Sequence, residues 1–281
     1  MARLFVCNLT VLDFAYLDAA RGLLGESWRV HVELGGTLDA QGMVLDFAHV
    51  KRDIKRTLDA HFDHRLLVPA RHPGLAVEPD GDRLRLRFAL DDGASILHDS
   101  PAAAVALVEA AAIAPAAVSR AALELLRPTL PANVAELRLT LEPERIDGAH
   151  FHYAHGLKHH RGNCQRIAHG HRSRIEIRCD GEREPALEAT WADRWRDIYI
   201  ATREDLVGES AGRMRFGYRA AQGKFALELP VGRCYLVDCD STIENLAQHV
   251  AETSARERPG RHVEARVFEG IDKGAFGEAR V

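Results

Sequence analysis

Histidines gather in one stretch of the chain, AHFHYAHGLKHHRGNCQRIAHGH, residues 149–171, which holds seven of the fifteen histidines and one of the five cysteines. His169 and His171 are two residues apart in a segment that reads as a strand, so both imidazoles should lie on one face. His155 belongs to an earlier strand that we expect beside it. Three neutral imidazoles with an open fourth position are typical of a catalytic zinc site.

Spacing alone favours a less specific interpretation, because a His-x-His pair is more often a solvated strand end than a metal site. The third histidine and the nearby cysteine strengthen the metal interpretation. We expect the other four histidines to be exposed or supporting residues; these are His150, His152, His159 and His160.

Cys164 lies five residues before His169. A thiol close to a dication would have its thiolate favoured and could remove a proton from carbon. As a fourth zinc ligand it would instead close the site. The sequence leaves both roles open.

Composition argues against several classes of protein. The 37 basic and 41 acidic residues are scattered and give a net charge of −4, so we expect no nucleic-acid partner. The first residues lack the apolar core of a signal peptide or a membrane span. Five cysteines without a spaced framework suggest reduced thiols. We therefore expect a cytoplasmic protein that does not bind membranes.

The chain repeats itself. The segment ELRLTLEPERIDGAHF, residues 136–151, resembles EARVFEGIDKGAFGEA, residues 264–279, with Glu142 matching Glu269. The residues around Gly25 resemble in pattern those around Gly170. We predict two tandem domains of similar fold, residues 1–147 and 148–281.

Each half also carries helical periodicity. Residues 46–62 place Phe47, Val50, Ile54 and Leu58 on one face, and residues 115–126 form a second helix. Residues 241–253 match that second helix, with Ser241 and Glu244 spaced as a capping box. Alternating strands surround these helices. The pattern predicts an α+β fold, with an antiparallel four-stranded sheet and two helices on one face in each half.

Together these motifs resemble the family of 6-pyruvoyl-tetrahydropterin and 6-carboxytetrahydropterin synthases. FHYAHGL, the cysteine loop and HGHRSRIEI are similar to its metal-binding strands, and GMVLDFAHVKRDIKRTLDAHFDHRLL, residues 42–67, is similar to its first helix and Asp-His turn. STIENLAQHV and Glu269 are similar to its second helix and pterin-binding strand. The resemblance implies the tunnelling fold, in which subunits join edge to edge into a barrel, and hence a homo-oligomer.

The same resemblance implies roles for individual residues. His155, His169 and His171 would bind Zn²⁺, Cys164 would be the general base, and Glu269 would bind the pterin. Asp63 and His64 would form a proton-transfer pair, although spacing alone favours a simple helix-end role for them.

The two halves depart from the family pattern in opposite ways. The first has Tyr16 and Leu24-Gly25-Glu26 where the second has His155 and His169-Gly170-His171, so it cannot hold this zinc. The second half has no Asp-His turn. We therefore predict one composite site per chain, formed within one chain or between neighbouring chains.

The resemblance implies a zinc-dependent lyase that acts on 7,8-dihydroneopterin triphosphate or a close relative, with elimination of triphosphate and side-chain rearrangement. The alternatives are a non-catalytic pterin- or purine-binding protein and different chemistry on a related heterocycle. The sequence leaves open the product and the number of subunits.

Overall fold

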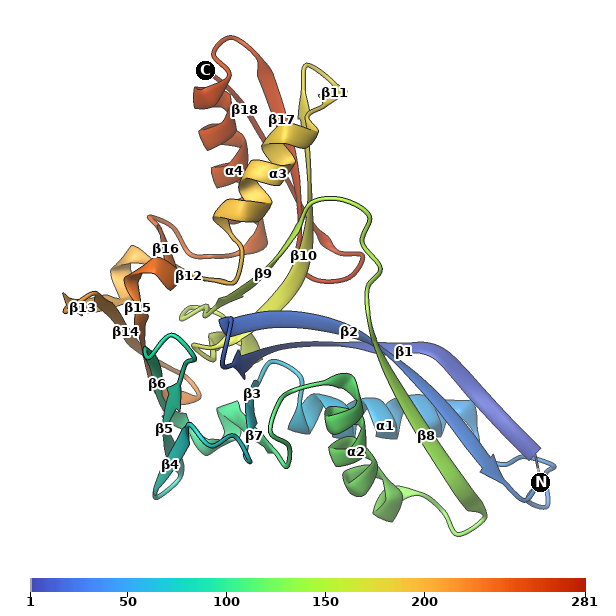
Figure 1. Ribbon diagram of the computed structural model, residues 1–281. Helices are drawn as coiled ribbons and strands as arrows, with labels where there is room; N and C mark the ends of the chain where they lie inside the picture. Colours follow the sequence, from blue (N-terminus) through green and yellow to red (C-terminus); the bar gives the residue numbers. More distant parts are fainter. Residues whose placement is uncertain (1) are drawn as a thin grey trace.

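The computed structural model describes residues 2–281, except for the side chain of His49. Within these residues the chain forms three sheets and four α-helices (Figure 1). The elements of the first half are β1 (Ala2–Asp18), β2 (Gly22–Gly36), α1 (Phe47–His61), β3 (Leu66–Pro69), β4 (Leu75–Asp80), β5 (Arg83–Ala89), β6 (Ser95–Pro101), β7 (Val105–Val108), α2 (Pro115–Leu126) and β8 (Val134–Pro143).

The second half repeats this order, with a short additional strand before its first helix and another additional strand at its end. Its elements are β9 (His150–His155), β10 (His169–Cys179), β11 (Glu182–Arg183), α3 (Pro185–Arg194), β12 (Ile198–Thr202), β13 (Leu206–Ser210), β14 (Arg213–Ala220), β15 (Gly223–Pro230), β16 (Cys234–Val237), α4 (Ile243–Glu257), β17 (His262–Phe268) and β18 (Gly274–Arg280). The predicted division after residue 147 falls in the connection between β8 and β9.

The main sheets of the two halves share one strand order. The first is β7-β3-β1-β2-β8 and the second is β16-β12-β9-β10-β17-β18, with β11 added to β10. The predicted α+β class and the tandem arrangement are confirmed. Each sheet has more than the four strands predicted, because two short strands join its edge in parallel. These are β3 and β7 in the first sheet and β12 and β16 in the second.

The helices cover one face of each main sheet, α1 and α2 in the first half and α3 and α4 in the second (Figure 1). Helix α1 begins where the Asp46 side chain accepts a hydrogen bond from the Ala48 amide at 2.6 Å, and Val50, Ile54 and Leu58 are buried on its inner face.

Two details of the predicted helices are wrong. Thr242, not Ser241, caps α4, because its hydroxyl accepts the hydrogen bond from the Asn245 amide. Two helices were predicted in the second half, but the position of α3 was not, because its small and charged residues hide the periodicity of its buried Leu187 and Trp191.

Strands β2 and β10 cross in very close contact where the halves meet. A β-carbon added at Gly25 would lie 1.9 Å from the Tyr153 carbonyl oxygen and 2.2 Å from the His171 amide nitrogen. One added at Gly170 would lie 2.7 Å from the Gly25 α-carbon. Only glycine permits this approach, so both glycines determine how closely the halves pack.

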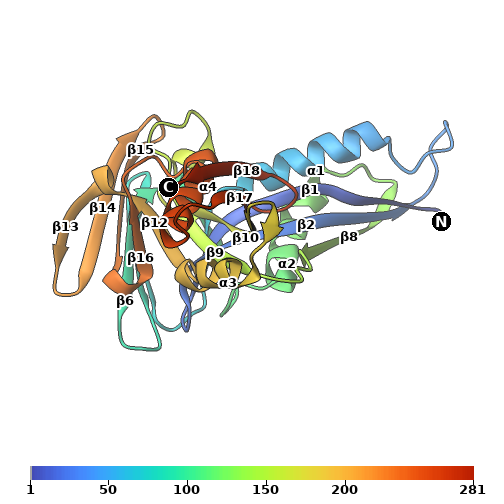
Figure 2. The same ribbon diagram turned by 90° about the horizontal axis from the view of Figure 1, so that it is seen from above.

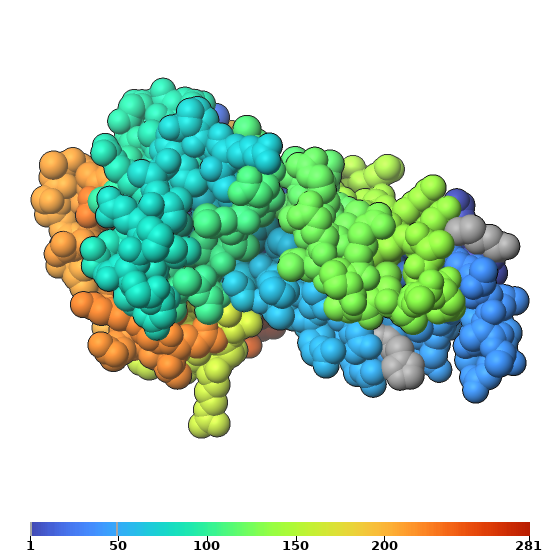
Figure 3. Space-filling model, turned by 90° about the horizontal axis from the view of Figure 1, so that it is seen from below, coloured from blue at the N-terminus to red at the C-terminus, as the bar shows by residue number. Residues whose placement is uncertain are grey.

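The third sheet joins the halves a second time. Each half inserts a three-stranded meander, and β6 pairs with β15 to give the order β13-β14-β15-β6-β5-β4. Viewed from above and from below, the two meanders lie side by side at one end of the molecule (Figures 2 and 3). Behind them one hydrophobic core contains residues of both halves, including Phe88, Ala154, Phe216 and Phe225. The halves are therefore one packed body.

No helix in the described part of the chain is long and apolar enough to cross a membrane.

Candidate functional site

The three predicted metal ligands meet in the second main sheet. His155 ends β9 and pairs directly with His169 at the start of β10, and His171 follows two residues later on the same face. One ring nitrogen of each lies within 4.8 Å of those of the other two, and all three side chains are almost fully buried. Pairing of adjacent strands therefore brings His155 next to residues that follow it by 14 and 16 positions.

Hydrogen bonds occupy one ring nitrogen of His155 and of His169, and neither ring nitrogen of His171 has a hydrogen-bond partner among the described residues. The Nδ1 atom of His155 is 2.9 Å from the Ser241 carbonyl oxygen, and that of His169 is 3.1 Å from the Arg166 carbonyl oxygen. Both Nδ1 atoms must donate to these carbonyls, so each Nε2 atom carries a lone pair. Among the described residues these Nε2 atoms, and that of His171, have no hydrogen-bond partner.

This donor set fits a zinc ion. Burial holds the pKa of His155 and of His169 well below the ordinary value, so both rings are neutral as metal ligands must be. Buried polar atoms without partners are costly in a protein interior, and a bound cation would satisfy all three Nε2 atoms at once. Three histidines would leave a fourth position for a substrate oxygen.

Asp63 and His64 come from the first half, directly after α1. The Asp63 Oδ2 atom is 2.5 Å from His64 Nδ1, and His64 has a positive φ of 53°. The His64 ring stacks on His169 with centroids 5.4 Å apart and lies 6.2 Å from His171. The pair thus lies beside the histidine cluster of the same chain, as the composite-site hypothesis requires.

Cys164 completes this group. It lies in a short 3-10 turn, Asn163–Gln165, and its thiol is close enough to His64 to raise the pKa of that imidazole. Burial lowers the pKa of His64, but the hydrogen bond with Asp63 and the nearby Cys164 thiol outweigh burial and raise it to about 10. His64 is therefore protonated at neutral pH and can donate a proton.

The inserted meander of the second half holds the cysteine loop in place. Gln222, in the turn between β14 and β15, donates from its amide nitrogen to Gln165 Oε1 at 2.6 Å and from its side chain to Asn163 Oδ1 at 2.8 Å. The Tyr218 hydroxyl donates to the Gln165 carbonyl at 2.9 Å. Both neighbours of Cys164 are thereby fixed by an element outside the main sheet.

Glu269 also lies at the cluster. It follows β17, its Oε1 atom is 3.9 Å from His171 Nε2, and its side chain is partly exposed. A carboxylate in this position could accept hydrogen bonds from a ligand held next to the histidines. All seven predicted site residues are thus brought to one place.

Sequence reasoning missed several residues that support the site. The Arg166 guanidinium donates to the His64 carbonyl at 3.1 Å while its own carbonyl accepts from His169, so it links the two halves. Asp13 lies 3.2 Å from His171 Nδ1, and Lys273 Nζ donates to Asp13 at 2.9 Å. The signal for Asp13 was a single acid within the apolar run VLDFAY, residues 11–16.

The first half holds the matching positions in altered form. Tyr16 pairs with Leu24 as His155 pairs with His169, and Glu26 stands where His171 stands. The register therefore supports the predicted loss of metal ligands from this half. In the second half the residue equivalent to His64 is Asp197, which also has a positive φ. Its carboxylate accepts two hydrogen bonds from the Arg21 guanidinium, at 2.9 and 2.5 Å.

Glu26 makes a testable contribution to pH-dependent stability. Burial raises its pKa to about 7, against opposing hydrogen bonds, so its folded pKa lies above the ordinary 4.5. Between these values the unfolded chain loses the proton first, and stability therefore falls as pH rises from about 4.5 to 7. At pH 8 we expect the free energy of unfolding of Glu26→Gln to exceed that of the wild type by about 2 kcal/mol. At pH 4.5 we expect little difference between them.

Denaturant unfolding at both pH values measures this effect. Gln can still accept the hydrogen bond that the Ser27 amide gives to Glu26 Oε1, so the variant removes only the charge. An equal difference from wild type at both pH values would show that the buried carboxyl does not titrate as proposed.

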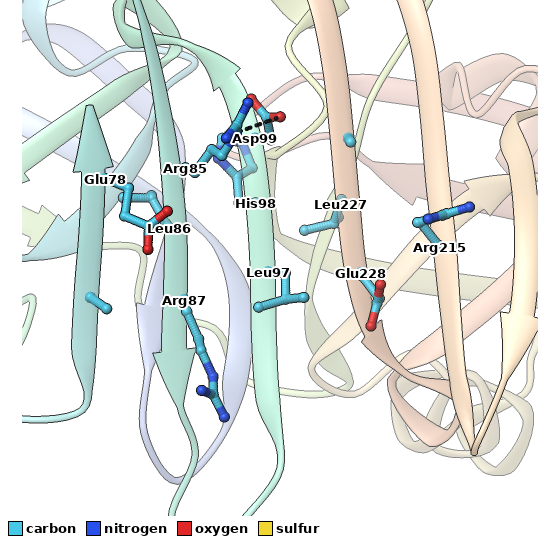
Figure 4. A pocket seen from close by; sticks show the side chains of 12 residues that line it. Glu78, Arg85, Leu86, Arg87, Leu97, His98, Asp99, Arg215, Leu227 and Glu228 are labelled. Carbon is cyan, nitrogen blue, oxygen red and sulfur yellow. Dashed lines mark ion pairs between the residues drawn. The ribbon is translucent and has the colours of Figure 1, made fainter. Parts of the chain in front are cut away.

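A separate hollow of about 370 Å³ lies on the six-stranded sheet. Figure 4 shows its lining side chains, which come from β4, β5, β6, β14 and β15, and an ion pair of 3.6 Å between Arg85 and Asp99. His98, beside it, is buried, and burial lowers its pKa to about 4. None of the residues in the histidine cluster lines this hollow, so we place the chemistry at the cluster.

The chain matches the family model described as 6-pyruvoyl tetrahydropterin synthase twice, over residues 12–131 and over residues 146–278. These matches cover most of the chain. The protein therefore belongs to the 6-pyruvoyl tetrahydropterin synthase family, as a member with two tandem copies of the domain.

Individual relatives are distant. The chain is 33% identical over 57 residues to a putative 6-carboxy-5,6,7,8-tetrahydropterin synthase of Pyrococcus horikoshii, and this covers 20% of the chain and 33% of the relative. The match thus spans about a third of that protein. Solved 6-pyruvoyl tetrahydropterin synthases of Plasmodium falciparum and Plasmodium vivax are similar at 14% and 16% identity, with TM-scores of 0.40 and 0.37. Each covers 51% of this chain and 98% of its own.

Proposed function

We propose that this protein is a zinc-dependent, pterin synthase-like lyase with one composite active site per chain. The observation that carries the proposal is the meeting of residues from different halves. The second half supplies Cys164 and three buried imidazoles with free Nε2 atoms, and the first half supplies the Asp63–His64 pair. Membership in the family supports a pterin as the substrate class. We propose 7,8-dihydroneopterin triphosphate or a close relative.

His155, His169 and His171 would hold the zinc ion. Zinc bound there would polarise oxygen atoms of the substrate side chain and so acidify the neighbouring C–H bond. Burial holds the pKa of His155 and of His169 well below the ordinary value, and neutral rings suit this role because they bring no competing charge.

Cys164 and His64 would move the protons. The Cys164 thiolate takes a proton from a side-chain carbon, and the protonated His64 beside it returns a proton to the substrate. Asp63 holds His64 Nδ1 at 2.5 Å and so fixes the orientation of the ring. In the elimination step the C–H and C–O bonds break, a C=C bond forms and triphosphate leaves with the C–O electrons.

Glu269 would bind the pterin ring. Its carboxylate accepts hydrogen bonds from the N–H groups of the ring, and this fixes the side chain over the histidines. The positions of Glu269 and His171, 3.9 Å apart, support this assignment.

A barrel-forming homo-oligomer is part of the proposal. Within the described residues β8 pairs only with β2 and β18 only with β17, so both strands are free edges of their sheets. Phe276 on β18 is 61% exposed. Edge pairing between copies would cover these strands, and light scattering during size-exclusion chromatography would show a single chain if the proposal is wrong.

The proposed role of Cys164 can be tested by metal analysis and a substrate assay on the same samples. We expect Cys164→Ala to keep one zinc per chain and to lose about 10²–10⁴-fold in turnover of dihydroneopterin triphosphate, because it lacks the base. Cys7→Ala is the control, since Cys7 is an exposed thiol in β1.

Other outcomes would distinguish the alternatives. Loss of zinc in Cys164→Ala would make the thiol a fourth ligand. A wild-type protein that binds a pterin without consuming triphosphate substrate would be a binding protein, and the lyase proposal would be wrong.

A further inference from the structure

Asp13 is a buried carboxylate in strand β1 of the half that has lost its metal ligands. Its side chain is only 6% exposed. Ser27 Oγ donates to its Oδ1 atom at 2.5 Å, Lys273 Nζ donates to its Oδ2 atom at 2.9 Å, and His171 Nδ1 lies 3.2 Å from Oδ1. Two of these three partners belong to the second half.

The backbone of Asp13 is tied to the proton-transfer pair. Its amide donates to Asp63 Oδ1 at 3.0 Å, and its carbonyl accepts from the His64 amide at 2.7 Å. The same residue therefore contacts both groups that compose the proposed active site, one through its side chain and the other through its main chain.

We propose that Asp13 is a positioning residue that orients His171 for zinc binding, so that the metal-free half supplies the carboxylate behind a metal ligand of the other half. The inference rests on the zinc site of the proposed function. A metal-bound histidine commonly donates its second ring N–H to a carboxylate or a carbonyl, which fixes the ring and raises its basicity. His155 and His169 each face a carbonyl, and His171 faces Asp13.

The symmetry of the repeat supports this assignment. In the strand registers Asp13 corresponds to His152, and Glu26 corresponds to His171. The reciprocal contact, between His152 and Glu26, also exists, at 4.0 Å. The chain therefore has two equivalent carboxylate–histidine contacts across its halves, and only the contact made by Asp13 involves a residue of the histidine cluster.

The buried carboxylate of Asp13 has two partners besides His171. Lys273 Nζ donates to it at 2.9 Å and Ser27 Oγ at 2.5 Å. Burying an ionised carboxylate is costly unless it is paired and hydrogen-bonded. Lys273 and Ser27 provide that pairing, and they leave the carboxylate beside His171.

The test compares zinc affinity in Asp13→Asn, Asp13→Ala and Glu26→Gln, by competition with a chromophoric chelator. We expect Asp13→Ala to bind zinc 10–100-fold more weakly than wild type, and Asp13→Asn to lie between, since its amide oxygen can still accept from His171. Glu26→Gln makes the same chemical change in the equivalent contact and should keep wild-type affinity. The visible absorption of bound Co²⁺ should change in both Asp13 variants, because it reports ligand geometry.

Each outcome decides the matter. Wild-type zinc affinity and an unchanged Co²⁺ spectrum in Asp13→Asn and Asp13→Ala would overturn the inference and leave the zinc enzyme standing. Equal weakening in Glu26→Gln would also overturn it, because the effect would then be a general loss of packing. If Asp13→Ala fails to fold, Asp13→Asn alone decides. A wild-type protein that binds no zinc would remove both the inference and the proposed function.

Discussion

Replacing His64 with asparagine should lower turnover of the pterin substrate by about 10²–10⁴-fold while one zinc ion per chain is retained. The loss follows from the position of His64 between Asp63 and Cys164, where its raised pKa of about 10 keeps it a proton donor at neutral pH. An amide cannot transfer that proton. Zinc should remain, because the three ligands belong to the other half.

Asparagine is the informative substitution because His64 has a φ of 53°. Asparagine tolerates this left-handed backbone, whereas alanine there would add backbone strain to the loss of the proton donor. The control is His61→Asn, a substitution of an exposed histidine at the end of the same helix. It should leave both turnover and zinc content unchanged.

The measurement is steady-state turnover together with metal analysis on the same preparation. Loss of zinc along with activity would mean that His64 holds the cluster together and is not a proton donor. Full activity in His64→Asn would show that Asp63 and His64 only end the helix, the role that their spacing alone suggested.

The repeat and the core of the site could be predicted from sequence because they depend on local patterns. The spacing of His169 and His171 fixes a shared face of one strand, and the match of Leu24-Gly25-Glu26 to these residues is reproduced by the strand registers. The loss of ligands from the first half follows directly from that match.

Other parts of the site depend on contacts that no local pattern records. Lys273 reaches Asp13 across 260 positions, and Arg166 reaches the His64 carbonyl across 102. Neither contact follows from propensity or periodicity, because each requires the two halves to meet at a particular angle. That angle depends on Gly25 and Gly170, whose close approach is visible only once both sheets are folded.

The inserted meanders illustrate the same limit. Alternating patterns predicted strands around the helices, and β5 and β15 are two such strands. Their joining into one six-stranded sheet was not predictable, since edge strands of similar pattern can pair in several ways. The consequence matters for the site, because the turn after β14 carries Gln222, which holds the loop of Cys164.

Removal of zinc should lower the stability of the whole chain. A ligand that binds only the folded state adds RT ln(1 + [L]/Kd), about 4 kcal/mol at a free zinc concentration 1,000 times Kd. Without the ion, the three buried Nε2 atoms would have no partner. The chelated protein should therefore unfold at lower temperature than the zinc-loaded protein, and re-addition of zinc should restore the transition.

The stoichiometry gives the sharper form of this prediction. We expect one zinc ion per chain, none in His169→Ala, and one in His150→Ala, which alters a histidine of the same strand as His155 but outside the cluster. His169→Ala should also lose the thermal response to chelator, whereas His150→Ala should keep it. Two ions per chain, or zinc retained in His169→Ala, would contradict the assignment of all metal binding to the second half.

Asp13 and His64 of the first half contact this cluster. The unfolding transition that depends on zinc should therefore involve both halves together. A chelator-sensitive step confined to one half would argue against a composite site.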